Sequence, residues 1–149
     1  ESFMMIVIGD GDKEVIKNMI NKIGSNFIRY EGPIIEPIIL SKYYTVCDLF
    51  LFPGDVGLGP LTAISYNALP IIIESNTHNP EIEYLNNDNS VILPKETNCE
   101  VFAETISEYL NDKNKIKQKN NRSWKTIKHL TLEAMVNNFS ASIERLKFE

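Results

Sequence analysis

The segment with the clearest chemical character is a loop, Pro53 to Gly59, that holds three glycines and a single carboxylate. Glycine has no side chain, so Gly54, Gly57 and Gly59 let the backbone come close to a ligand such as a phosphate. Asp55 has two open interpretations, since its carboxylate can accept a hydrogen bond from a ligand hydroxyl or cap the helix that follows. An apolar run precedes the loop, which predicts a ligand site at the end of a buried strand, beside a helix N-terminus.

A second polar loop, Ser75 to Glu81, follows the next apolar run, Leu69 to Ile73. If the two strands are parallel neighbours, their carboxyl ends share one edge, which places His78, Asn79 and Glu81 on the same rim as the glycine loop. The alternative is an ordinary solvated loop, in which the helix dipole alone favours Glu81 near a helix start. We expect Glu81 or Asn76 to contribute to the site.

Gly9, Asp10 and Gly11 form a third candidate, because they follow an apolar run and precede a helical pattern. The glycines could admit a phosphate, but they also suit a tight turn with Asp12 as the helix cap, which we favour. Asp10 and Asp12 match a D-x-D spacing, yet two carboxylates in a turn are too common to predict a metal site. No His/Cys cluster has metal-ligand spacing and no Ser/His/Asp set can be assembled, so the catalytic residues stay unknown.

These loops must be positioned by strands and helices that the apolar pattern predicts. Expected strands are Phe3–Ile8, Asn26–Tyr30, Asp48–Phe52, Ile71–Ile73 and Ser90–Leu93. Expected helices are 15–23, Ile38–Val46, Pro60–Ala68, Pro80–Leu85, Cys99–Leu110, and one or two over Ile116–Leu146 with a break near Thr131. Strands that are apolar throughout belong to sheets covered on both faces. The expected fold is therefore α/β, a doubly wound, Rossmann-like parallel sheet with helices on both faces and a C-terminal helical extension.

Composition narrows the class of protein. With 149 residues and 43% hydrophobic content, the chain fits one domain, 1–149, that buries its own core. The net charge of -5 argues against a nucleic-acid partner, despite a basic stretch from Lys113 to Lys128. No apolar run approaches the ~20 residues that span a bilayer, and no signal peptide is recognised. The start lacks an initiator Met, so we expect a segment of a longer protein.

Three further residues have packing interpretations. Cys47 and Cys99 are far apart in sequence and each has apolar neighbours, so we expect buried free thiols in a reducing compartment. Trp124, with Ile127 and Leu130 beyond it, is expected to anchor a C-terminal helix. His129 is interpreted as an ordinary surface histidine.

Several motifs occur in a familiar order. They are Ile6–Gly11 (I-V-G-D-G type), Val46–Pro53 (A-D-x-F-V-x-P type), Gly57–Gly59 (G-F-G type), Leu69–Ile72 (G-x-P-V-I type), Pro80–Ile82 (P-E-I) and Thr131–Phe139, a closing helix. In this order they resemble the C-terminal, donor-binding half of a GT-B-type glycosyltransferase of the retaining, family 4-like kind. The resemblance covers nearly the whole chain.

The sequence also departs from that family. The family carries two glutamates in an E-x7-E motif, the first before G-F-G and the second on the next helix, where it contacts the ribose. Counting from Asp55 reaches Ala63 and counting from Val56 reaches Ile64, so neither register supplies the second carboxylate. The family's basic strand and helix, which neutralise the donor diphosphate, and its N-terminal acceptor domain are not in this chain.

The resemblance implies a function and a set of site residues. A UDP- or GDP-sugar would be bound and its hexosyl group transferred to a glycan or lipid-linked acceptor, in polysaccharide biosynthesis, without a metal or other cofactor. The implied nucleotide-sugar contacts are Gly9, Asp10, Gly11, Gly54, Asp55, Val56, Gly57, Leu58, Gly59, Thr62, Asn76 and Glu81. The chain alone is expected to be inactive. The longer protein is expected in the cytoplasm, with peripheral association at the inner membrane face as an option.

Two alternatives stay open. The first is a degenerate, non-catalytic interaction module of the same fold, which the loss of the second glutamate favours. The second is part of a nucleotide-sugar epimerase, whose acid and base residues would lie mostly in the missing half. Resemblance of fold alone does not decide among them.

Overall fold

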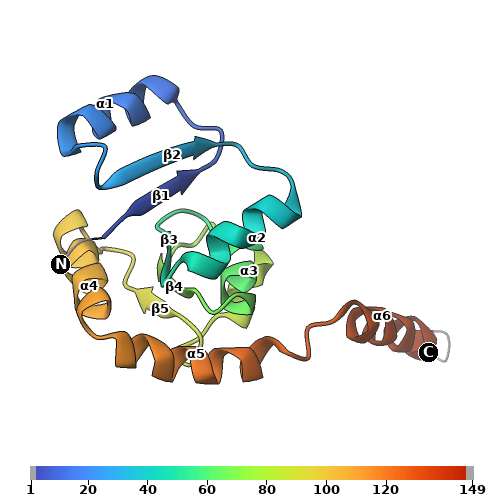
Figure 1. The fold of residues 1–149 in the computed structure, drawn as a ribbon. Helices are drawn as coiled ribbons and strands as arrows, with labels where there is room; N and C mark the ends of the chain where they lie inside the picture. Colours follow the sequence, from blue (N-terminus) through green and yellow to red (C-terminus); the bar gives the residue numbers. More distant parts are fainter. Residues whose placement is uncertain (1–2, 147–149) are drawn as a thin grey trace. The chain divides into compact units, whose positions relative to one another are not determined.

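The computed structural model describes residues 3–146. The chain divides into two compact units, residues 1–46 and 47–149, and each is described by itself. Figure 1 shows the succession of strands and helices along the chain. The expectation of one domain over 1–149 stays a prediction.

The first unit is a β-α-β arrangement followed by a helix. Its elements are β1 (Met5–Ile8), α1 (Lys13–Ile23), β2 (Ile28–Gly32) and α2 (Pro37–Val46). The strands are parallel, with Met5 opposite Ile28 and Val7 opposite Tyr30. Helix α1 begins after Asp12, whose carboxylate accepts hydrogen bonds from the next turn, as predicted.

The second unit holds a three-stranded parallel sheet in the order β3-β4-β5. Its elements are β3 (Leu49–Phe52), α3 (Gly59–Ser65), β4 (Leu69–Ile73), the 3₁₀ helix η1 (Pro80–Tyr84), β5 (Val91–Leu93), α4 (Cys99–Asn111), α5 (Lys113–Ile127) and α6 (Leu132–Leu146). The middle strand, β4, pairs Leu69 with Leu49 and Ile71 with Val91. This register brings the ends of β3 and β4 together at one edge.

Both faces of this sheet are covered, because successive side chains of β4 enter two different clusters. Ile72 packs with Ile64 of α3 and Ile127 of α5. Ile71 packs with Tyr109 of α4 and with Ile116 near the start of α5. The expected α/β fold with parallel strands and helices on both faces is thereby confirmed.

In the C-terminal helices, the predicted packing of two side chains is wrong and the predicted break is confirmed. Trp124 is 53% exposed, so it is not the anchor that was expected; Ile127, three residues later, reaches the core instead. Leu130 is also exposed. The predicted break near Thr131 is confirmed, since α5 ends at Ile127 and the Thr131 hydroxyl accepts a hydrogen bond from the first turn of α6.

The cysteines are free, but the prediction that both are buried is wrong. Cys47 is half-buried, and Cys99, the first residue of α4, is exposed. An apolar neighbour in sequence does not bury a residue at a helix start, because side chains in the first turn diverge around the axis. His129 is exposed, as expected.

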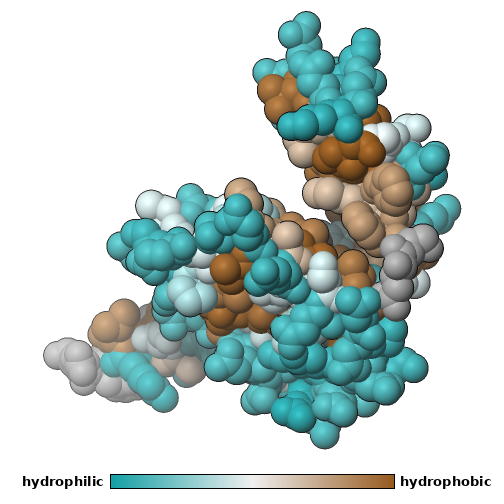
Figure 2. All heavy atoms as spheres, turned by 90° about the vertical axis from the view of Figure 1, so that its left-hand side faces the viewer, coloured by the Kyte–Doolittle hydropathy of each residue, from teal (hydrophilic) through white to brown (hydrophobic). Residues whose placement is uncertain are grey.

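Hydrophobic side chains also reach the surface. Helix α6 has no buried residue, and Leu132, Met135 and Phe139 are exposed along it. Figure 2 shows such brown atoms at several places among a mainly hydrophilic surface. Within residues 3–146, no helix combines the length and apolar character needed to cross a bilayer.

Candidate functional site

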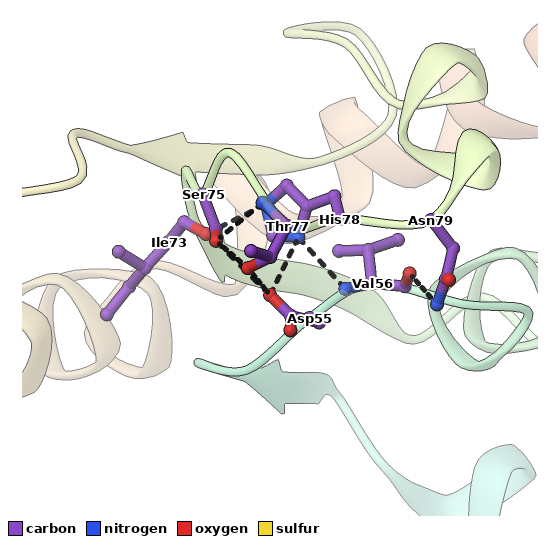
Figure 3. A network of polar contacts seen from close by, with 7 residues as sticks. All are labelled: Asp55, Val56, Ile73, Ser75, Thr77, His78 and Asn79. Carbon is purple, nitrogen blue, oxygen red and sulfur yellow. Dashed lines mark hydrogen bonds and ion pairs between the residues drawn. The ribbon is translucent and has the colours of Figure 1, made fainter.

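The loops that leave β3 and β4 meet at the carboxyl edge of the sheet and are joined by hydrogen bonds (Figure 3). The predicted convergence of the glycine loop with the polar loop after β4 is therefore confirmed. Parallel neighbours place their carboxyl ends together, and sheets of this kind bind ligands at that edge.

Asp55 is tied to the polar loop through one of its two carboxylate oxygens. Its Oδ1 accepts hydrogen bonds from the Thr77 hydroxyl at 2.6 Å and from the Ser75 hydroxyl at 3.2 Å. These bonds, that of Thr77 first, lower the pKa of the Asp55 carboxyl below its ordinary value, because they stabilise the charged form. The side chain is 52% exposed. Within residues 3–146, nothing bonds to Oδ2, which leaves it free to accept a ligand hydroxyl.

The capping interpretation of Asp55 is wrong. The N-cap position of α3 is Leu58, and no side chain caps this helix. Helix α3 has only seven residues, so a contribution from its dipole to anion binding is small. The Asp55 carboxylate instead joins its own loop to the loop that follows β4.

His78 lies between the two loops with a side chain only 3% exposed. Its Nδ1 accepts the backbone N–H of Val56 at 2.9 Å, and its Nε2 lies 3.1 Å from the carbonyl oxygen of Ile73. Because Nδ1 accepts a proton donor, it carries no proton, and the ring is the neutral tautomer that donates from Nε2. The 4.0 Å approach of Nδ1 to Asp55 Oδ1 is therefore not an ion pair.

Val56 is held from the other side by Asn79. The Asn79 side-chain amide donates to the Val56 carbonyl at 3.0 Å, and the Asn79 backbone N–H donates to the same oxygen at 3.1 Å. The Val56 side chain is fully buried in the core cluster with Ile64 and Ile72. Val56, implied by the resemblance as a ligand contact, is thus an internal anchor whose backbone groups are already bonded.

The three glycines of the loop have different reasons to be glycine. At Gly59, a Cβ would lie 3.2 Å from the Phe50 ring, so close packing disfavours a side chain. At Gly57, a Cβ would meet only the Asn79 amide at 3.7 Å, an ordinary contact, and at Gly54 it would meet nothing within 4 Å. Neither position has a positive φ. The fold therefore does not require glycine at 54 and 57, and the backbone at both positions has open space beside it.

The other residues implied for this region surround the loop pair. Leu58 is exposed, and the Thr62 hydroxyl bonds back to the Leu58 carbonyl at 3.1 Å. Asn76 is exposed between Ser75 and Thr77. Oε2 of Glu81 is buried and has no hydrogen-bond partner within the described residues. Burying a carboxylate oxygen without a partner is costly, so this oxygen is available to a donor group.

Gly9, Asp10 and Gly11 belong to the first unit, where the turn explains them. Gly9 has φ +146°, a conformation that favours glycine, and its backbone N–H donates to the Gly32 carbonyl at 3.0 Å. A Cβ at Gly11 would meet the Ile16 side chain at 3.3 Å. Asp10 is exposed. A ligand role for these three residues stays a prediction.

Both positions that could replace the family's second glutamate lie in the core. Ala63 is 0% exposed and Ile64 is 2% exposed. A carboxylate there would be removed from water, at a large cost in free energy. The ribose contact of the E-x7-E motif therefore has no equivalent on α3.

Ser75 and Thr77 were missed as site residues by the sequence analysis, although the polar stretch after β4 pointed to them. A cavity of about 360 Å³ in the first unit, lined by Ile6, Arg29, Ile39, Lys42, Tyr43 and Val46, contains none of the predicted contacts. Across residues 3–146, no group of three or more His, Cys, Asp or Glu side chains is placed to hold a metal. Metal independence stays a prediction.

Comparison with known proteins gives a fold and a distant sequence relative. No family model matches the chain. A glycogen synthase from Clostridium beijerinckii (strain ATCC 51743 / NCIMB 8052) is 29% identical over 85 residues, which are 50% of this chain and 16% of that protein.

Three solved structures have similar folds at low sequence identity. The GtfA/B complex matches with a TM-score of 0.78 at 14% identity, over 98% of this chain and 30% of that chain. The pneumococcal O-GlcNAc transferase GtfA, in complex with UDP and GlcNAc, has a TM-score of 0.69 at 14% identity, with the same coverage of 98% and 30%. Anabaena Alr3699/HepE, in complex with UDP-glucose, has a TM-score of 0.70 at 15% identity, over 95% and 41%. The chain thus spans less than half of each similar protein and has the Rossmann-like α/β fold of these three structures.

Proposed function

We propose that this chain is the donor-binding part of a glycosyltransferase that uses a nucleotide-diphosphate sugar. The observation that carries the proposal is the pairing of a half-exposed carboxylate, Asp55, with two glycines, Gly54 and Gly57, that the fold itself does not require. They lie at the carboxyl edge of a parallel sheet, where ligands of such sheets bind. The similar structures include one with UDP-glucose and one with UDP and GlcNAc, which supports the same ligand class.

The glycine loop and the loop after β4 have different roles in this proposal. The backbone at Gly54 and Gly57 admits the diphosphate, and the free Oδ2 of Asp55 accepts a sugar hydroxyl. Glu81 or Asn76 contributes from the loop after β4. Gly9, Asp10 and Gly11 enter the proposal through the resemblance alone.

The reaction proposed for the whole protein is transfer of a hexosyl group, with retention, to a glycan or lipid-linked acceptor. Charge that develops on the leaving diphosphate would be stabilised by backbone N–H groups and by basic residues outside this chain. No resident metal is needed for that arrangement. Since the chain covers only 16–41% of its relatives, it is expected to bind the donor weakly by itself and to catalyse no transfer.

A second candidate is a non-catalytic interaction module of the same fold. The burial of Ala63 and Ile64 favours it, because the usual ribose contact is missing. Binding measurements separate the two candidates. A module without a donor site would fold normally and bind no nucleotide.

The test is isothermal titration of the chain with UDP, GDP, UDP-glucose and GDP-mannose. We expect saturable binding of one nucleotide class, weakened about tenfold by Asp55→Ala, because one hydrogen bond to a charged group is lost. Glu104→Gln, at an exposed position on α4, removes one negative charge away from the loops and serves as the matched control. Absence of binding by a chain shown to be folded would favour the module, and sugar transfer by the chain alone would contradict the expected inactivity.

A further inference from the structure

The His78 side chain is only 3% exposed, and the proposed function gives it no ligand to contact. We infer that His78 is a positioning residue: its neutral ring fixes the peptide group that carries Asp55, and thereby sets where that carboxylate meets the donor. This inference rests on the proposed function for its ligand, while the positioning itself can be tested without one. Four hydrogen bonds hold this arrangement: three join Val56 to His78 and Asn79, and the fourth joins the His78 ring to the Ile73 carbonyl.

The peptide group between Asp55 and Val56 is held by His78. Its N–H donates to Nδ1 of His78, and the ring is itself held through the bond from Nε2 to the Ile73 carbonyl at the end of β4. A ring bonded at both nitrogens has one orientation. The strand end therefore fixes the ring, and the ring fixes the peptide.

The peptide group between Val56 and Gly57 is held by Asn79. Its carbonyl accepts two hydrogen bonds from Asn79. A trans peptide is planar, with N–H and C=O in opposite directions, so the Gly57 N–H points away from Asn79. The two peptide groups that flank Val56 are thus set by two consecutive residues of the other loop.

His78 and Asn79 hold different peptide groups. Asn79 controls the Gly57 N–H, whereas His78 controls the peptide that carries Asp55. Val56 loses its hydrogen-bond acceptor when the His78 ring is removed. Because Val56 is fully buried, its N–H cannot reach water without movement of the loop. Loss of the Nδ1 acceptor is therefore expected to move Asp55 more than loss of the Nε2 donor, which leaves the Val56 N–H paired.

Two substitutions distinguish these contributions. In His78→Asn, the side-chain oxygen occupies a δ position like that of Nδ1, so it can still accept the Val56 N–H. In His78→Gln, the amide nitrogen occupies an ε position like that of Nε2, so it can still donate to Ile73 and leaves Val56 unpaired. Each variant loses the ring and one buried hydrogen bond, which makes the two a matched pair.

The experiment measures UDP-glucose affinity by titration and hydrogen exchange of the Val56 amide by NMR, with urea unfolding of both variants. We expect His78→Gln to lose about tenfold in affinity and in hydrogen-exchange protection of the Val56 amide. His78→Asn should retain most of both. The two variants should lose similar amounts of stability. Equal effects of the two variants on Val56 protection, whether both lose it or both keep it, would overturn the inference.

Two further outcomes keep the test decisive. If the native chain binds no nucleotide, the proposed function fails, but Val56 protection still tests the positioning. If either variant does not fold, ¹⁵N shifts of the native His78 ring decide. A proton on Nε2 alone supports the inference, and a proton on Nδ1 overturns it.

Discussion

Replacement of Gly57 by alanine is expected to raise stability and weaken donor binding at the same time. The added Cβ would lie 3.7 Å from the Asn79 amide nitrogen, which is an ordinary van der Waals distance, and Gly57 has no positive φ. The native backbone therefore accepts alanine without strain. Alanine also restricts the unfolded chain, which stabilises a compatible position by about 0.4–1 kcal/mol.

Binding is expected to change in the opposite direction. If the diphosphate or sugar lies against the open side of Gly57, a methyl group occupies the space of ligand atoms in contact with the backbone. A tenfold loss of affinity, about 1.4 kcal/mol, is the expected scale. Urea unfolding gives the stability and titration with UDP-glucose gives the affinity. Gly54→Ala, where a Cβ meets nothing within 4 Å, is the companion variant.

Two outcomes would contradict this prediction. A variant that is less stable would show that the space at Gly57 is not open. Unchanged affinity in both alanine variants, with stability raised, would refute the claim that a ligand explains these glycines.

Three other substitutions have outcomes that the structure predicts. Gly9→Ala is expected to destabilise the fold by about 1–3 kcal/mol, measured by urea unfolding, because φ of +146° strains any other residue, and an unchanged midpoint would contradict this. Thr77→Val is expected to raise the pKa of Asp55 toward its ordinary value of 3.8, which carboxyl ¹³C NMR measures. Because the pKa of Asp55 is lower in the folded state than in the unfolded state, the Thr77 bond stabilises the protein above the unfolded pKa, and this contribution is lost as pH falls through the folded pKa. The stabilities of the native protein and the variant should therefore converge in acid. Ala63→Glu is expected to destabilise by several kcal/mol and to restore no nucleotide affinity, because the position is in the core, and a stable variant with tighter binding would overturn that placement.

The strands and the site edge could be predicted from the sequence because they depend on local patterns. The apolar runs at β3 and β4, with glycines and polar residues just beyond them, were sufficient to expect that the two loops converge. The Asp12 cap was predictable for the same reason, since its partners are two and three residues away.

The partners of Asp55 could not be predicted in the same way. Thr77 lies 22 residues away in the chain, and its bond depends on the register between β3 and β4. The exposed position of Trp124 was also missed, because helical spacing identifies a face but not the side on which the core lies. In both cases the deciding contact is tertiary.

The most direct test of the account is a ¹H–¹⁵N NMR titration of the chain with UDP and UDP-glucose. The backbone amides of Gly54, Gly57 and Leu58 report on the loop, and those of α6 serve as an internal control. We predict saturable shifts of the loop amides, with those of α6 unchanged. Saturable shifts confined to other segments, or none at all with a folded chain, would contradict the claim that this loop binds the donor diphosphate.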